Sequence, residues 1–178
     1  MDSPLTRDSP GIAASSKLGS SPVHEANSKN ESASSPMLDP NDPRLIALLE
    51  SYRRYMHRTL ASPKELYGAP FVVLAHGTEL PPILWYGNAK ALELWEMDFA
   101  DFTQMESYKT AEPGLRDARE RLLREVTLQG YSAGYRGIRI TRTGRRFEID
   151  QATVFNIIDK AGKNLGQAAT FDRWHWLE

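Results

Sequence analysis

Three strand-like segments in the last third of the chain constrain its fold more than any other part of the sequence. Runs of β-branched, aromatic and alternating apolar residues predict strands at 135–141, 146–158 and 165–171. The connections between them are short and contain Gly144 and Gly162, as tight turns do. Because such turns join antiparallel neighbours, we expect a meander within one sheet.

The middle segment of this meander carries apolar residues on both faces. Alternation along 146–158 predicts two sets: Phe147, Ile149, Thr153, Phe155 and Ile157 on one face, and Ala152, Val154 and Ile158 on the other. A sheet with two partly apolar faces needs a cover on each of them, so we expect helices on both sides.

The segments before the meander are predicted to form the helices that pack on the sheet and two further strands. Apolar residues three and four apart predict a helix at 43–60, and Asn41-Asp42-Pro43 is a typical start because a capping residue precedes proline. The remaining pattern predicts short strands at 71–76 and 83–86, a short helix at 89–95, a helical piece near 98–105 and a longer helix at 114–129. We expect the helix at 43–60 to lie across the outer face of the sheet.

The first 40 residues differ in composition from the rest. They contain ten serines and five prolines but no Phe, Trp or Tyr, so they cannot bury enough apolar surface to offset the entropy lost on ordering. We expect residues 1–40 to form a disordered Ser/Pro-rich tail, and residues 41–178 to form a single domain.

The order of the predicted elements over residues 69–171 resembles that of the PAS domain. Short motifs agree with this resemblance. Tyr86-Gly87-Asn88 is similar to the strand-to-helix junction of PAS domains, residues 142–147 to their hairpin, and residues 157–162 to the turn before their last strand.

Several sequence blocks resemble one PAS-like family more closely, the MEKHLA domain family. They are residues 51–54, 85–88, 91–95, 135–139, 144–147 and 166–171, although the literal hexapeptide Met-Glu-Lys-His-Leu-Ala is absent. The resemblance implies an α+β, PAS-like fold with a five-stranded antiparallel sheet, flanking short helices and an N-terminal helix. It also implies a sensory, ligand-binding or interaction role.

Composition excludes several kinds of chemistry. Without cysteine the chain cannot form a disulfide, a thiolate metal site or the cysteinyl flavin adduct of light–oxygen–voltage domains. None of its four histidines lies within 88–130, where a haem ligand of a PAS domain would be expected, and we predict no metal site. The net charge of −1 argues against nucleic-acid binding. No apolar run is long enough to span a bilayer, so we expect a soluble, cytoplasmic protein.

The resemblance to PAS domains implies a ligand pocket between the sheet and the short helices. The candidate pocket residues are Trp85, Asn88, Leu92, Trp95, Phe147, Ile149, Gln151, Phe155, Gln167, Ala169 and Phe171. The same side chains could instead fill a closed core, which is the default state of a protein interior. The sequence requires no cofactor. The alternatives are a non-covalently bound flavin, hydrogen-bonded by Gln167, or another small ligand.

Charge is distributed unevenly along the chain. Residues 114–146 hold nine arginines and three acidic residues, whereas residues 79–112 carry a net charge of −5. We interpret these runs as solvated faces with local pairing. The alternatives are head-to-tail self-association or an anionic ligand or partner near Arg136, Arg139, Arg142, Arg145 and Arg146. Near the C-terminus, Trp174 and Trp176 must pack on the domain or on a second copy of the chain.

These patterns favour a non-catalytic sensory or interaction module that binds a small ligand or a protein partner, with a homodimer or a signalling partner as the assemblies to consider. No residue is predicted to be catalytic. The alternative is a small isomerase- or cyclase-like enzyme that uses a cone-shaped cavity of the sheet. That enzyme would need an acid or a base on the inward face of the first strand or of the long strand.

Overall fold

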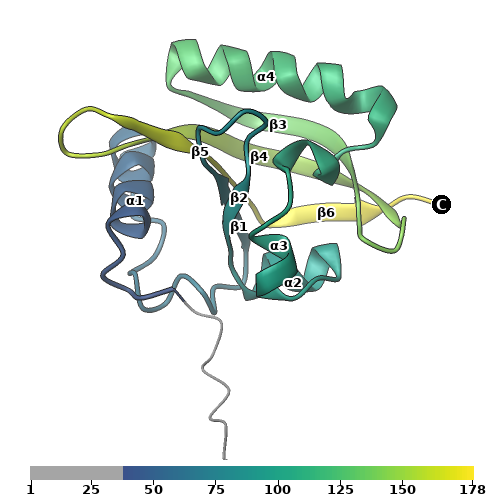
Figure 1. Ribbon diagram of the computed structural model, residues 1–178, viewed down its shortest axis with the longest axis horizontal. Coiled ribbons are helices and arrows are strands. Elements are labelled where there is room, and N and C mark those ends of the chain that lie inside the picture. Colours follow the sequence, from purple (N-terminus) through teal and green to yellow (C-terminus); the bar gives the residue numbers. More distant parts are fainter. Residues whose placement is uncertain (1–37) are drawn as a thin grey trace, which may run out of the picture. The chain divides into compact units, whose positions relative to one another are not determined.

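The computed structural model describes residues 38–178, in which helices and strands follow the predicted order (Figure 1). The predicted disordered tail, 1–40, lies outside the described residues except for its last three. The helical elements are α1 (Pro43–Met56), α2 (Ala89–Trp95), α3 (Phe99–Phe102), η1 (Ser107–Thr110), η2 (Pro113–Leu115) and α4 (Arg116–Gln129). The strands are β1 (Val72–His76), β2 (Leu84–Gly87), β3 (Tyr131–Ile140), β4 (Arg146–Ile158), β5 (Asn164–Phe171) and β6 (Arg173–Trp176).

Within residues 38–178 the strands form one six-stranded sheet of order β2-β1-β5-β4-β3, with β6 paired to β4. Every neighbouring pair is antiparallel, which confirms the predicted α+β fold. The sixth strand was not expected. It arises because the chain bends at Asp172 after β5 and continues along β4, where Trp176 pairs with Phe147.

The two C-terminal tryptophans pack on the domain through this extra strand. The ring of Trp174 lies 6.1 Å from that of Phe171, and the ring of Trp176 lies 5.5 Å from that of Phe147. Both contacts are edge-to-face, the arrangement that aromatic pairs favour.

Gln151 interrupts the alternation of β4. Its φ of 58° is left-handed. The pairing of β3 with β4 shifts register nearby, because Tyr135 pairs with Ala152 but Gly137 pairs with Ile149. Two residues of β4, Asp150 and Gln151, therefore lie opposite the single residue Arg136 of β3, which is a β-bulge.

The bulge changes which side chains share a face. Ile149 before it and Val154 after it both point toward the side of α2 and α4, whereas Phe155 and Ile157 point toward α1. The prediction that Phe147 and Phe155 lie on the same face is therefore wrong, since one extra residue inverts the alternation beyond it.

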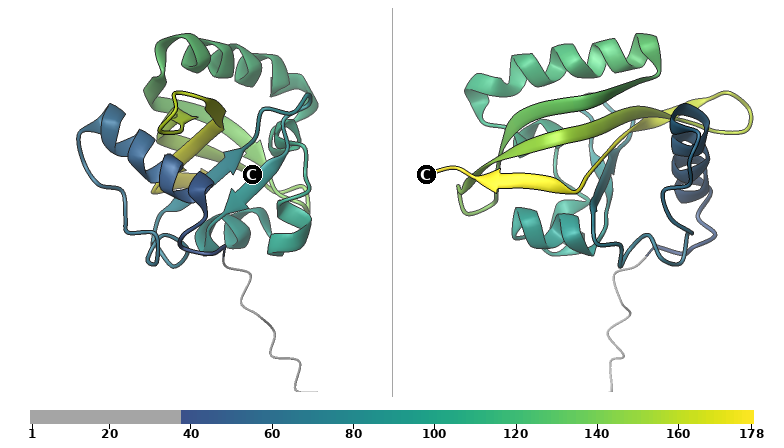
Figure 2. Two further views of the ribbon diagram at one scale, coloured as in Figure 1. Left: turned by 60° about the vertical axis from the view of Figure 1, so that its left-hand side comes forward. Right: turned by 180° about the vertical axis from the view of Figure 1, so that it is seen from behind.

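Helices cover both faces of the sheet (Figures 1 and 2). On one face α1 packs on β4, and on the other α2 contacts β1, α3 contacts β2, and α4 runs along β3 and β4. The side chains of β1 and β5 point alternately toward these two layers of helices. Val73 and Ala168 join the cluster under α1, whereas Val72 and Phe171 join the cluster on the side of α2.

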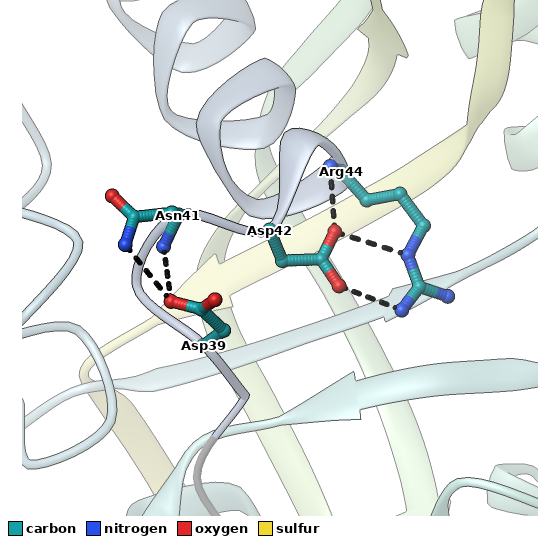
Figure 3. Close-up of polar contacts among 4 residues, drawn as sticks. All are labelled: Asp39, Asn41, Asp42 and Arg44. Atoms are coloured by element: carbon teal, nitrogen blue, oxygen red, sulfur yellow. Dashed lines mark hydrogen bonds and ion pairs between the residues drawn. The ribbon is translucent and has the colours of Figure 1, made fainter.

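Asp42 starts α1. Its carboxylate accepts a 2.8 Å hydrogen bond from the backbone N–H of Arg44 and two more from the Arg44 guanidinium, at 3.2 and 2.8 Å (Figure 3). The side-chain bond from Arg44 lowers the pKa of the Asp42 carboxyl. The helix ends at Met56 rather than at Leu60 as predicted, because His57 adopts a left-handed φ of 55° and its N–H donates to the Arg53 carbonyl.

Ser51 fixes α1 to the sheet. Its hydroxyl oxygen accepts a 2.9 Å hydrogen bond from the backbone N–H of Ile158 and donates to the Ile158 carbonyl at 3.2 Å. No helix in the described part of the chain is long and apolar enough to cross a membrane.

We expect Gly166→Ala to destabilise the fold much more than Gly162→Ala. Both glycines have positive φ, 129° and 82°, but a Cβ on Gly166 would lie 1.9 Å from the His76 carbonyl oxygen, whereas Gly162 has open space around it. Urea unfolding should give a loss of about 1 kcal/mol for Gly162→Ala and about 3 kcal/mol or more for Gly166→Ala. Equal losses would contradict the close contact between β5 and the end of β1.

Candidate functional site

A small cavity lies between α4 and the face of the sheet that α2 and α3 also cover. Its volume is about 50 Å³, and most of its wall is apolar, including Trp95, Ile149 and Phe171. The polar side chains that line it are His76, Thr110, Arg119, Tyr135, Arg139 and Gln167. An apolar space with a few convergent polar groups is typical of small-molecule sites.

The cavity adjoins a larger groove of about 800 Å³. The groove is lined by residues of α4, by Tyr108 of η1 and by the loop at 77–82. His76, Arg119, Leu123 and Gln167 line both spaces, so they form the neck between the groove and the cavity.

The structure brings some of the predicted pocket residues together at this cavity and places others elsewhere. Those that line it are Trp95, Ile149, Gln167, Ala169 and Phe171. Those that do not are Trp85, Asn88, Leu92, Phe147, Gln151 and Phe155.

Trp85 and Phe155 belong to the cluster under α1, on the other face of the sheet. The guanidinium of Arg44 lies 4.8 Å above the Trp85 ring, a cation–π contact. Phe155 packs edge-to-face on Tyr52 of α1 with ring centres 5.5 Å apart. Both side chains therefore help to hold α1 on the sheet.

Two other predicted residues pack near the cavity without lining it, and a third lies elsewhere. Phe147 packs behind Trp95, with ring centres 5.2 Å apart, and Leu92 belongs to the same core cluster. Gln151 is exposed at the bulge and lines a separate hollow beside α1.

Asn88 is fully buried and has a structural role. Its side-chain oxygen accepts hydrogen bonds from the backbone N–H groups of Val73 and Ala91, at 2.9 and 3.1 Å. Its amide nitrogen donates to the carbonyls of Phe71 and Leu66, at 2.7 and 3.4 Å. One side chain thus caps α2 and also ties that helix to β1.

Gln167 connects β5 to α4. Its amide nitrogen lies 2.9 Å from the Leu123 carbonyl, 3.1 Å from the Thr127 hydroxyl and 3.0 Å from the Asn156 side-chain oxygen. Asn156 in turn donates to the Val126 carbonyl at 3.0 Å. The nitrogen of Gln167 is thus engaged by the protein, and α4 is held at one end of the cavity.

Two buried groups in the cavity wall have no hydrogen-bond partner among the described residues. They are Nε1 of Trp95, a residue 1% exposed, and Nε2 of His76, a residue 9% exposed. The other ring nitrogen of His76, Nδ1, lies 2.8 Å from the Gly77 carbonyl. Buried polar groups are usually satisfied. Five other buried side-chain atoms without a hydrogen-bond partner lie elsewhere in the described residues, among them Trp85 Nε1 and the hydroxyls of Tyr86 and Ser107, whereas these two belong to residues that line one cavity.

Two arginines reach the same cavity. Arg139 of β3 is 8% exposed, and its guanidinium donates to the Ile138 carbonyl at 2.8 Å and to the Tyr135 hydroxyl at 3.2 Å. Arg119 of α4 is partly buried at the neck. Burial, and then the positive charge of Arg139, lower the pKa of Arg119 to about 10, which leaves it charged at neutral pH.

His76 is neutral at neutral pH. Its pKa is lowered to about 4, mainly by burial and to a smaller extent by the charge of Arg119, while the Gly77 carbonyl and Glu79 act in the opposite direction. With Nδ1–H donating to Gly77, Nε2 is left as a buried acceptor without a partner.

Sequence reasoning did not place His76, Arg119 or Arg139 in the pocket, although Arg139 was named among the arginines near which an anionic ligand or partner could bind. A signal was present for Arg119, because it stands between Leu115 and Leu122 at helical spacing on the apolar stripe of 114–129. A charged residue on an apolar stripe points inward. For Arg139 no local signal separates it from the neighbouring arginines of the same run.

No metal centre is indicated in the described range. Within residues 38–178, no group of three or more histidine, aspartate or glutamate side chains is placed to hold a metal ion.

Comparisons with known proteins agree with the geometry. The family model of the MEKHLA domain matches residues 44–176. No curated protein matches the sequence significantly.

Two solved structures share the fold. The PAS domain of a protein from Colwellia psychrerythraea is 11% identical, with 64% of this chain and 92% of that chain covered and a TM-score of 0.55. A light-oxygen-voltage domain studied with a flavin analogue is 12% identical, with 65% and 84% covered and a TM-score of 0.52. At these identities the likeness establishes a PAS-like fold alone.

The buried His76 should make stability depend on pH. Since its folded pKa is about 4 against an ordinary 6.5, the unfolded state takes up the proton first, and stability falls as the pH drops below 6.5. Between pH 7 and pH 5 the loss from this residue should be about 2 kcal/mol. Urea unfolding of the native chain and of His76→Gln at both pH values measures it, because the glutamine variant lacks this contribution. An equal pH dependence in both proteins would show that His76 is not buried as a neutral ring.

Proposed function

The chain belongs to the MEKHLA domain family, and from this membership and the cavity we propose that it is a non-catalytic sensory module that binds a small molecule between α4 and the sheet. The observation that carries this proposal is the pair of orphaned groups in the cavity wall, Trp95 Nε1 and His76 Nε2. Each such group destabilises an empty fold by about 1–3 kcal/mol, and a bound molecule with a matching acceptor and donor would remove that penalty.

The size of the two spaces bears on the kind of ligand. A cavity of about 50 Å³ is much smaller than the roughly 300 Å³ or more of typical drug-sized sites. The groove beyond the neck adds about 800 Å³. We therefore propose a ligand with one small end in the cavity and the rest of its body in the groove.

A bound flavin is not favoured by the same observations. The isoalloxazine ring is far larger than the cavity, and the amide nitrogen of Gln167, the residue expected to bind it, is engaged with α4 and Asn156. The full sequence also has no cysteine for a thiol adduct.

The layers of the fold offer a route by which binding would be sensed. Val154 packs under α4 beside the cavity, and the next residue, Phe155, packs on Tyr52 of α1. A ligand that moved β4 or α4 would therefore change the packing of α1 on the opposite face. We propose α1 as the element that reports occupancy to a partner protein or to a second copy of the chain.

The enzyme alternative has less support. It needs an inward-facing acid or base, and His76 at the end of β1 is a candidate by position. Among the described residues no carboxylate lines the cavity to act with it. We therefore propose binding rather than catalysis.

Ala169→Phe should abolish ligand binding. Ala169 lines the cavity from β5, and a phenyl ring there would occupy the space. The full chain, purified from cells, is extracted with organic solvent and analysed by mass spectrometry beside this variant. We expect a small molecule in the native extract that is absent from the variant extract.

Ala118→Phe is the matched control, because Ala118 is exposed on α4 and lines neither space. It should carry the same molecule as the native chain. Thermal unfolding of all three proteins confirms that each is folded. If folded native protein contains nothing beyond what folded Ala169→Phe contains, the cavity is not a ligand site and the proposal is wrong.

A further inference from the structure

We propose that the ligand is an organic carboxylate whose acidic group enters the cavity and binds between Arg119 and Arg139. This inference rests on the proposed function, and it adds the chemical class of the ligand. Its basis is a buried positive charge that the described part of the chain leaves uncompensated.

Most arginines of β3 and the following hairpin have acidic partners. The pairs are Arg136 with Asp150 at 2.8 Å, Arg142 with Asp101 at 2.5 Å, Arg145 with Glu96 at 2.9 Å and Arg146 with Glu112 at 2.5 Å. This agrees with the interpretation of the arginine-rich run as a locally paired surface.

Arg119 and Arg139 depart from that pattern. Within residues 38–178, neither has a carboxylate within 4.0 Å, and no aspartate or glutamate lines the cavity. The acceptors of Arg139 are the neutral Ile138 carbonyl and the Tyr135 hydroxyl. Buried charges are normally paired, so two like charges at one cavity indicate a missing anion.

The orphaned donor of the cavity wall suits a carboxylate, whereas the orphaned acceptor, His76 Nε2, requires a donor from the rest of the ligand or from water. Trp95 Nε1 is a donor without an acceptor and can bond one oxygen, while the two guanidinium groups can bond both. A planar carboxylate also fits a cavity of about 50 Å³ with apolar walls better than a more strongly hydrated phosphate does.

The groove suits an apolar body attached to that head. Beyond Arg119 at the neck, its wall includes Pro82, Tyr108 and Leu123, and Leu80 at its rim is 95% exposed. Three arginines, Arg116, Arg119 and Arg124, line the groove against two acids, Glu79 and Glu120, so its net charge is positive. Fatty and aromatic acids combine the head and the body that these two spaces require.

The test compares acids with their amides. Thermal unfolding of the full chain is measured at constant ionic strength with acetate, butyrate, octanoate and benzoate, with the four corresponding amides, and with inorganic phosphate. We expect octanoate or benzoate to raise the midpoint and its amide to leave it unchanged. Titration calorimetry should then show binding about tenfold or more weaker in Arg119→Gln and in Arg139→Gln.

Arg121→Gln is the matched control, since Arg121 lies on exposed α4 surface and lines neither space. It should bind as the native chain does. Arg119→Gln keeps the test decisive if Arg139→Gln fails to fold, because the loss of Arg119 breaks no hydrogen bond within the described residues.

Three results would contradict the proposal that the ligand is a carboxylate. The first is that no acid exceeds its amide, the second is that phosphate exceeds every acid, and the third is that the shift survives in Arg119→Gln. If an amide binds as well as its acid, the ligand need not be an anion, but the cavity is still a ligand site. The extraction of Ala169→Phe decides that broader question separately.

Discussion

A single inserted residue in the longest strand determines how the two sides of this domain are built. Gln151, with its left-handed φ of 58°, adds one residue to β4 opposite Arg136 of β3, and a second irregularity between Ser132 and Tyr135 restores the register. Ile149 and Val154 consequently face the cavity together, and Phe155 is left for α1. Opposite the bulge β5 ends and β6 begins, since β5 pairs with β4 from Thr153 onward and β6 pairs with it up to Asp150. Because the alternation of β4 is inverted at this one point, the strand contributes Ile149 and Val154 to the side of the cavity and Phe155 to the side of α1.

The cavity follows from how the layers are tied. Asn88 fixes α2 to β1, and Gln167 with Asn156 fixes α4 to the sheet beside the cavity. Gly166 lets β5 approach the His76 backbone, which holds that histidine at the neck. A rigid frame of this kind can keep buried groups unpartnered until a ligand binds, and such local strain is characteristic of functional sites.

Much of the fold could be predicted from the sequence, because turns at Gly144 and Gly162 and the cap at Asp42 are local signals. The bulge could not, since a glutamine gives no sign that it will adopt a left-handed conformation. That one omission placed Phe155 on the wrong face. The site was harder still, because Arg139 differs from Arg136 and Arg142 only in lacking an acidic partner, and partners such as Asp101 and Asp150 are set by tertiary structure.

The central claim is that Arg119 and Arg139 form an anion site inside a PAS-like cavity. A crystal structure of the full chain grown with octanoate tests it most directly. The account predicts carboxylate oxygens within about 2.7–2.9 Å of both guanidinium groups, with the alkyl chain in the groove beside Tyr108. Density for octanoate elsewhere on the protein, or a protein carboxylate paired with Arg139 in the cavity, would contradict it.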